Sequence, residues 1–159
     1  SLVFMGNIEV SGYLPIEDIN YVLPEFMRND SAFIDRIHGI IPGWEIPKIK
    51  KSEIHLSTNY GFSVDYFSEI LHELRKLDFT PLIRSMTELN NVTIRDEIGI
   101  YRIASGLAKI LFPSKQFDKD ELKLVMDLAV KLRQKVADLL NKMSPGEYEK
   151  KKIEWRYRG

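Results

Sequence analysis

Residues 93–112 read TIRDEIGIYRIASGLAKILF, and Pro113 follows directly. Thr93 and Asp96 have the spacing of a capping box, with aspartate in the place of the usual glutamate or glutamine, so they predict a helix start. The apolar residues of the stretch fall on two helix faces, which is typical of a helix buried at the centre of a bundle. Pro113 cannot continue the helix. This stretch therefore predicts a central helix and a mainly helical fold.

Further helices are predicted on both sides of this stretch. Apolar side chains recur at three- and four-residue spacing, and Pro81 suits the first turn of a short helix. The predicted helices are residues 31–37 with Asp30 or Ser31 as the cap, residues 62–77, a short helix after Pro81, and a long helix opened by Asp118 and Glu121 that ends near Ser144. The long helix has an apolar stripe made of Leu122, Val125, Ala129, Leu132, Val136 and Leu139.

Two short apolar runs predict strands in the first part of the chain. Residues 2–5 and 37–41 are each followed by a turn that contains glycine. An isolated strand pair is marginal in water, so we expect these runs to be the remainder of a larger sheet. The predicted organisation is a strand-containing segment at 1–57, a helical domain at 58–144 and a basic polar tail at 145–159.

Composition excludes several classes of protein. The chain has 159 residues, with 23 Lys+Arg and 23 Asp+Glu, so its zero net charge does not favour attraction to nucleic acid or to an anionic membrane. It has no cysteine, which excludes disulfides and thiolate metal sites and fits a cytoplasmic location. No apolar run approaches the roughly 20 residues of a membrane span, and no basic segment followed by an apolar run predicts a signal peptide. The spacing of the histidines predicts no metal site.

Several side chains are interpreted as structural rather than catalytic. Ser105 and Lys109 are one helical turn apart, but they lie in the predicted buried helix, where an exposed oxyanion site is not expected. Trp44 and Tyr60 lie beside turns and are expected to anchor packing.

The chain lacks the central motifs of a nucleotide site but has residues that suit its edge. It has no G-x-x-x-x-G-K-[ST] loop, and no apolar strand ends in an acidic pair. Asn7 follows a predicted strand, Arg36 ends a short helix, and Arg95 lies in the first turn of the central helix. Because the helix dipole disfavours a cation at a helix start, Arg95 is expected to have a negatively charged partner. This partner is either a bound anion or a neighbouring carboxylate, Asp96 or Glu97, and the sequence does not decide between them.

These residues lie in segments that resemble the second half of an AAA+ ATPase module of Lon-like and minichromosome-maintenance-like proteins. LVFMGN at 2–7 resembles the sensor 1 strand, and AFIDRI at 32–37 resembles the arginine-finger segment. VTIRD at 92–96, with IASGLAK at 103–109, resembles the lid helix with the sensor 2 arginine. RIHGIIPGWEIPK at 36–48 is similar to the most distinctive stretch of the Lon-like proteins of BREX phage-defence systems (the BrxL family), many of which are named ATP-dependent Lon proteases.

The resemblance implies a mainly α fold in which a helical AAA+ lid-type bundle follows a short, strand-containing remnant of the α/β ATPase sheet. It implies that Asn7 polarises the attacking water, that Arg36 reaches into the neighbouring subunit's site as an arginine finger, and that Arg95 contacts the nucleotide of its own subunit. ATP and magnesium are then cofactors of a full-length parent. We expect neither to bind this chain tightly, because the P-loop and the acidic pair are missing.

The resulting hypothesis is a fragment of a Lon-like ATPase that is inactive or nearly so alone, which leaves open whether the chain is itself an enzyme. We expect self-association, as a ring in the parent and as a dimer or exchange of the N-terminal segment here, and no membrane partner. DNA is a candidate partner of the basic residues Lys48, Lys50, Lys51, Arg156 and Arg158. The alternative function is a helical nucleic-acid-binding or protein-interaction module without catalysis.

Overall fold

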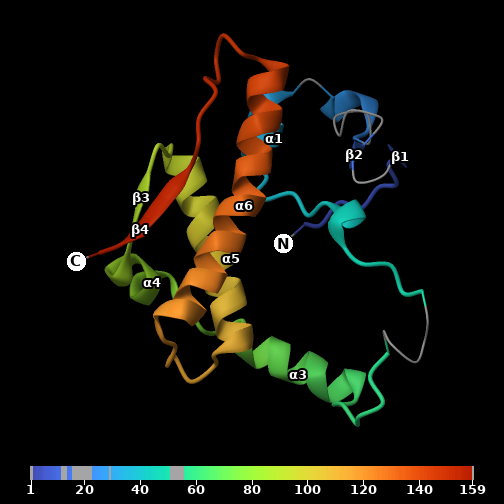
Figure 1. The fold of residues 1–159 in the computed structure, drawn as a ribbon, viewed down its shortest axis with the longest axis vertical. Helices are drawn as coiled ribbons and strands as arrows, with labels where there is room; N and C mark the ends of the chain where they lie inside the picture. The colour runs from blue at the N-terminus through green and yellow to red at the C-terminus, as the bar shows by residue number, and fades with distance from the viewer. Residues whose placement is uncertain (1, 12–13, 16–22, 29, 51–55, 159) are drawn as a thin grey trace.

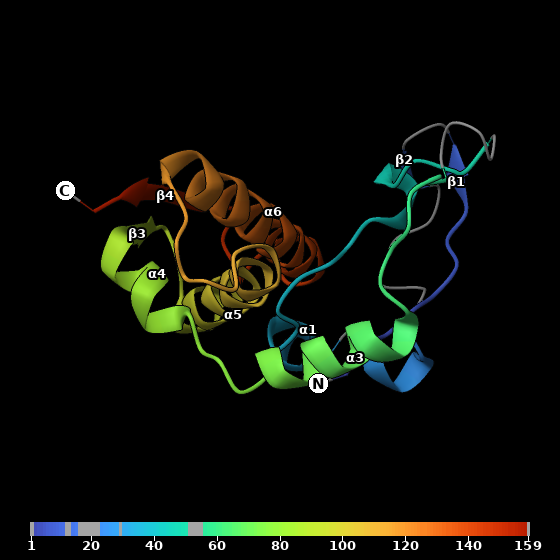
Figure 2. The ribbon, with the colours of Figure 1, turned by 90° about the horizontal axis from the view of Figure 1, so that it is seen from below.

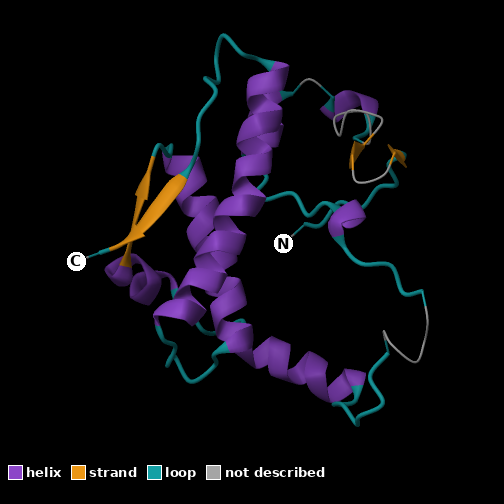
Figure 3. Cartoon of the chain, viewed as in Figure 1, coloured by secondary structure: helices purple, strands orange, loops and turns teal. Residues whose placement is uncertain are grey.

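The protein is mainly helical, as predicted, in a computed structural model that describes residues 2–11, 14–15, 23–28, 30–50 and 56–158. Figure 3 shows the two longest helices at the centre of the molecule and the short strands at its periphery. Among the described residues, no helix combines the length and the apolar character that crossing a bilayer requires. The helices are α1 (Ser31–Asp35), α3 (Val64–Leu74), α4 (Thr80–Met86), α5 (Ile94–Leu111) and α6 (Lys119–Met143), with 3-10 turns at Glu25–Met27 and Gly43–Glu45.

Helices α5 and α6 pack side by side at the centre, with α4 against α5 (Figure 1). Helix α3 extends away from one end of α5, as the two perpendicular views show (Figures 1 and 2). The first part of the chain lies on the opposite side of this helix pair from β3 and β4 (Figure 2). The main core consists of buried residues that include Phe79, Ile83, Ile100, Ala104, Leu122, Met126, Ala129 and Ile153. A second cluster packs α1 against α6 through Ile34, Val136, Leu139 and Leu140.

Both long helices start at the predicted residues, and a capping box forms at each start. The backbone N–H of Thr93 donates to the Asp96 carboxylate at 2.8 Å, and the Asp96 N–H donates to the Thr93 hydroxyl at 3.2 Å. Asp118 and Glu121 make the same reciprocal pair at 2.8 and 2.9 Å. Each cap satisfies amide groups that have no partner within the helix and stabilises its start by about 1 kcal/mol. Asp30 caps α1 by accepting from the N–H of Phe33 at 2.9 Å.

The two predicted strands at 2–5 and 37–41 are wrong, because neither segment forms a strand. The second segment crosses α5 and α6 as extended backbone, and its Ile40 N–H donates to the Leu132 carbonyl of α6 at 3.2 Å. The first segment is exposed, and its Phe4 ring packs edge-on against Phe33 of α1 at 5.8 Å between centroids. A short apolar run cannot by itself distinguish a strand from an extended segment that packs on helices.

Strands occur at positions where the sequence pattern did not predict them. In the part of the chain that the structure describes, they form two antiparallel pairs, β1 (Val10–Ser11) with β2 (Leu14–Pro15) and β3 (Thr87–Asn90) with β4 (Glu154–Tyr157). Strand β4 lies in the segment that was expected to be a basic polar tail. It is joined to α6 by a hydrogen bond from Trp155 Nε1 to Asp127 at 2.7 Å, and the adjacent Ile153 is buried in the core.

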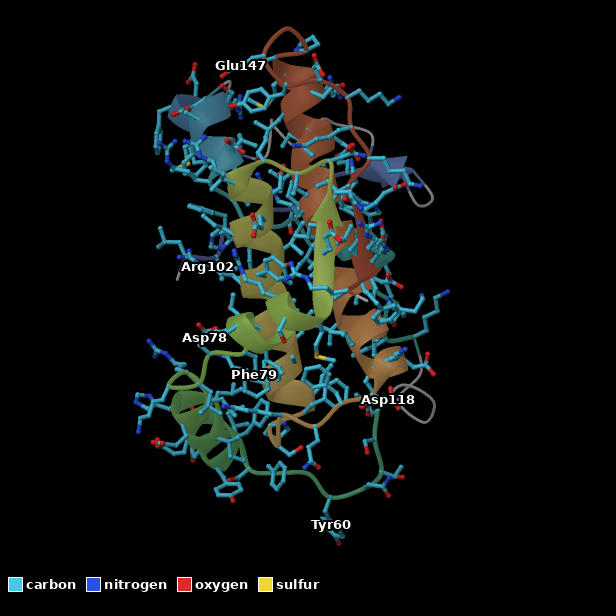
Figure 4. All side chains as sticks on the ribbon, turned by 90° about the vertical axis from the view of Figure 1, so that its left-hand side faces the viewer. Tyr60, Asp78, Phe79, Arg102, Asp118 and Glu147 are labelled. Atoms are coloured by element: carbon cyan, nitrogen blue, oxygen red, sulfur yellow. The ribbon has the colours of Figure 1, made fainter. Side chains whose placement is uncertain are left out.

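The apolar faces of two helices are partly exposed. None of the residues of α3, all of which the structure describes, is buried. On α5, Ile94 is 77% exposed, so this helix is buried on one side rather than all round. Figure 4 shows Tyr60 on the loop before α3, pointing away from the rest of the chain, and its side chain is fully exposed. The prediction that Tyr60 anchors packing is therefore wrong, whereas Trp44 is half-buried.

Gly39 allows the crossing segment to approach α5 and α6 closely. A Cβ atom at Gly39 would lie 2.9 Å from Ile103 Cδ1 and 3.0 Å from Leu132 Cβ. We expect Gly39→Ala to lower the free energy of unfolding by about 1–3 kcal/mol, because the segment or the helices must shift. Gly106→Ala is the control, since a Cβ atom there would have no neighbour within 4 Å and alanine favours a helix. Urea unfolding tests this, and equal midpoints for Gly39→Ala and the unsubstituted chain would contradict it.

Candidate functional site

A cluster of charged side chains lies where α1, α5 and α6 meet. At its centre is Arg133 of α6, whose side chain is fully buried. Its Nη2 donates to Asp35 Oδ1 at 2.8 Å, and its Nε donates to Asp96 Oδ1 at 2.7 Å. Arg95 and Lys151 complete the set, and we call these five residues the charge cluster. Because an unpaired buried charge is very costly, the cluster fixes the positions of α1, α5 and α6 relative to one another.

Arg133 also holds the backbone on both sides of Arg36. Its Nη1 donates to the carbonyl of Asp35 at 3.1 Å and to the carbonyl of Ile37. A guanidinium has several donors in a rigid planar arrangement, so one side chain can bind two carboxylates and two carbonyls at once. The residue between these two carbonyls, Arg36, is therefore held in place by contacts to its neighbours.

Asp96 joins the start of α5 to the centre of α6 and to the chain before β4. Burial alone would raise the pKa of Asp96. Hydrogen bonds from Lys151, from the Thr93 backbone and from Arg133 outweigh this effect and lower the pKa to about 2. The carboxylate therefore stays ionised near neutral pH, and it serves as helix cap and ion-pair partner together.

Acid is expected to weaken the fold through Asp96. Its folded pKa of about 2 lies below the ordinary aspartate value of 3.8, so its contribution is complete above about pH 4 and is lost as the pH falls toward 2. The loss expected from this shift is on the order of 2 kcal/mol. Urea unfolding between about pH 5 and pH 2.5 measures it. Asp96→Asn has no carboxyl to titrate at this position, so its stability should fall less over this range; an equally steep fall would exclude Asp96 as the cause.

Arg95 has a partner that the sequence did not indicate. Its Nη1 donates to Asp35 Oδ2, from a segment far away in the sequence, whereas Glu97 pairs with Arg84 at 2.9 Å. The local partner considered above, Asp96 or Glu97, is therefore not the one observed. The hydrogen bond and charge of Asp35 raise the pKa of Arg95. The Arg95 side chain remains 46% exposed, so it is accessible to a ligand from solvent.

Arg36 and Asn7 both lie on the surface. Arg36 follows α1 directly and is exposed, and its Nη1 donates to the Ala32 carbonyl within the same helix. Asn7 is exposed in the N-terminal segment that contacts α1 through Phe4. Arg95 thus contacts the side chain of Asp35, and Arg36 is the residue that follows Asp35 in the chain. Among the contacts of the described residues, none joins Asn7 to the charge cluster.

Ser105 and Lys109 have structural partners. The Ser105 hydroxyl accepts from the N–H of Phe79 at 3.0 Å and lies 3.3 Å from Asp78 Oδ1. Lys109 Nζ donates to the Leu77 carbonyl at 3.2 Å. Figure 4 shows Asp78 and Phe79 close together near the start of α4. These bonds fix the connection between α3 and α4 against α5, as the structural interpretation of both residues predicts.

The basic residues considered for DNA binding do not form one patch in the described ranges. Lys48 and Lys50 are exposed after the 3-10 turn at Gly43–Glu45, and Lys51 lies outside the described residues. Arg156 belongs to β4 and pairs with Glu88 of β3 at 2.9 Å, while Arg158 follows the strand and is exposed.

Arg133 is the main residue of the site that the sequence analysis missed. It lies four residues after Ala129 and three before Val136, so it shares the buried stripe of α6. A charged residue on an otherwise apolar stripe requires a buried partner of opposite charge. That signal was present in the sequence, and it indicates a buried acidic partner for Arg133, which the structure shows to be Asp35 and Asp96.

Comparison with known proteins assigns the family. The family described as Lon-like protease BrxL-like, ATPase domain, matches residues 1–154. The chain belongs to this family of ATPase domains. It is 38% identical over 151 residues to the Lon-like protease BrxL of Bacillus cereus (strain H3081.97), and 34% identical over 150 residues to the Lon-like protease BrxL of Escherichia coli O9:H4 (strain HS). Both matches cover 93% of this chain but only 22% and 21% of the relatives, so the chain spans about a fifth of their length.

Proposed function

We propose that this chain is the C-terminal part of an ATPase domain and supplies a helical lid and phosphate-contacting side chains to it. The observation that carries the proposal is that Arg36 and Arg95 are both accessible from solvent in a chain whose family is an ATPase domain, and that Arg95 contacts Asp35, the residue before Arg36. An ATPase domain acts on ATP, commonly together with magnesium. Guanidinium groups match the geometry and charge of phosphate oxygens, so both arginines fit such a ligand.

The three candidate residues would have different roles toward the nucleotide. Arg95, half-exposed at the start of α5, would contact the nucleotide of its own subunit. Arg36, exposed at the end of α1, would reach the nucleotide of a neighbouring subunit and stabilise the charge of the transferring phosphoryl group. Asn7 would orient the attacking water through its side-chain amide. This division requires a ring or another head-to-tail assembly, which we propose for the parent.

Other parts of the site would come from outside this chain. Within the described ranges, no group of three His, Asp or Glu side chains could hold a metal ion, so the magnesium ligands and the phosphate-binding loop would be supplied by the rest of a longer protein. The chain alone would then be inactive or nearly so. Because the relatives are named Lon-like protease BrxL, we further propose that the parent is a cytoplasmic ATP-dependent enzyme of BREX phage defence. No specific contact among the described residues favours DNA binding by this chain.

Nucleotide binding to the full-length protein that contains this chain tests the role of Arg95. We expect Arg95→Ala to weaken the affinity for a non-hydrolysable ATP analogue with magnesium by about 10- to 100-fold, which is typical of a lost hydrogen bond to a charged group. Arg84→Ala is the matched control. Arg84 is exposed to a similar degree, and it pairs with Glu97, which lies in the same turn of α5 as Arg95. Equal affinities of the Arg95→Ala variant and the unsubstituted protein, measured by titration calorimetry, would refute this role.

A further inference from the structure

Asp35 makes a different contact with each of its two carboxylate oxygens. Oδ2 accepts from Arg95, which is half-exposed, and Oδ1 accepts from the fully buried Arg133 at 2.8 Å. The Asp35 side chain itself is only 10% exposed. One contact thus faces solvent and can open, whereas the other is enclosed and cannot easily do so.

A carboxylate can occupy the place of a phosphate on a guanidinium. Both anions accept from the same pair of donors with similar geometry. If Arg95 left Asp35 for a phosphate, the buried carboxylate would keep its bond to Arg133 and would not become an uncompensated charge. The exchange therefore costs the protein little free energy, because Arg95 replaces one charge-assisted hydrogen bond by another.

We propose that Asp35 is a positioning residue that holds Arg95 in the absence of nucleotide and competes with the nucleotide phosphates for it. The inference rests on the proposed nucleotide contact of Arg95. It adds a link between the two predicted arginines, because Asp35 is the residue before Arg36 and belongs to the backbone that Arg133 holds. Nucleotide binding in one subunit would then break the contact between Arg95 and Asp35. This contact lies next to Arg36, which is proposed to act on the nucleotide of the neighbouring subunit.

The test is the affinity of the full-length protein for a non-hydrolysable ATP analogue with magnesium. Asp35→Asn keeps an acceptor for Arg133 but removes the negative charge that competes with the nucleotide phosphates for Arg95. We expect the variant to bind the analogue about two- to fivefold more tightly, the range set by a partly exposed ion pair. A merely structural role of Asp35 would leave the affinity unchanged or weaken it, so the direction of the change is diagnostic.

Two controls make this result specific. Glu97→Gln removes the ion-pair partner of Arg84 on the same helix turn and should leave the affinity unchanged. In the Arg95→Ala background, adding Asp35→Asn should no longer tighten binding, because the guanidinium for which Asp35 and the phosphates compete is absent. If Arg95→Ala weakens binding but Asp35→Asn does not strengthen it, the competition is refuted and the proposed function stands. If Arg95→Ala itself has no effect, the proposed nucleotide contact fails and the inference fails with it.

Folding of the variant is checked by thermal unfolding. If Asp35→Asn alone does not fold, the double variant Asp35→Asn with Arg133→Met replaces the buried pair by neutral groups. Asp96 then keeps its contacts with Lys151 and Thr93. The same tightening is expected in the double variant relative to Arg133→Met, and its absence would equally overturn the proposal.

Discussion

The Arg133→Met variant of this chain is expected to lose about 3–5 kcal/mol of unfolding free energy, the range measured when one partner of a buried ion pair is removed. Methionine can replace the aliphatic part of the arginine side chain but is shorter, so the change removes the charge and the donors together with some buried volume. Asp35 and Asp96 would each lose a buried cationic partner, and the carbonyls of Asp35 and Ile37 would lose their donor. Urea unfolding followed by circular dichroism measures the difference.

Two further variants show whether charge is the cause. Arg102→Met changes an exposed arginine of α5 and should alter the stability by less than about 0.5 kcal/mol. Adding Asp35→Asn and Asp96→Asn to Arg133→Met should restore part of the loss, because two amides at these buried positions need less charge compensation than two carboxylates that have each lost a cationic partner. A loss below about 1 kcal/mol for Arg133→Met would show that the cluster does not hold the fold together.

The second large effect is expected at Arg36 in the full-length protein. Arg36→Ala should lower the rate of ATP hydrolysis by about 10³–10⁵-fold, the range known for arginine fingers in other phosphoryl-transfer enzymes. Because a finger acts mainly on the transition state, binding of a non-hydrolysable ATP analogue should change little. Arg36→Lys should recover only part of the rate, since an ammonium lacks the planar donor pair.

Arg75→Ala is the matched control for Arg36. Both arginines are exposed and are the C-cap residues of a helix, α3 for Arg75 and α1 for Arg36. Steady-state ATP hydrolysis of Arg75→Ala should equal that of the unsubstituted protein. If Arg36→Ala were as active as Arg75→Ala, the residue would be a surface arginine without a role in hydrolysis.

Local signals in the sequence were sufficient to predict the helices. The pairs Thr93–Asp96 and Asp118–Glu121 each lie within one helical turn, so the sequence spacing already determines the cap geometry. The apolar stripe of α6 likewise predicts which face of this helix is buried. These features depend on neighbours three or four residues away, which is why they can be read without knowing the fold.

Contacts between distant segments could not be predicted in the same way. The path of residues 37–41 across α5 and α6 depends on Arg133 and Leu132, almost a hundred positions later in the chain. The pairing of β3 with β4 joins segments separated by the whole helix pair, and each strand has only four residues. The partly exposed apolar faces of α3 and α5 show a further limit, because an apolar pattern indicates that a face can be buried without saying what covers it.

The central claim is that Arg36 completes the site of a neighbouring subunit, and mixing two inactive full-length variants tests it most directly. One variant carries Arg36→Ala and the other carries Asn7→Ala, so neither has a complete site by itself. After the subunits exchange, an intact Asn7 and an intact Arg36 can meet across an interface, in about one interface in four at equal mixing. The account predicts that ATP hydrolysis returns on mixing. If the mixture stays as inactive as its components while subunit exchange is shown to occur, Arg36 does not act across the interface.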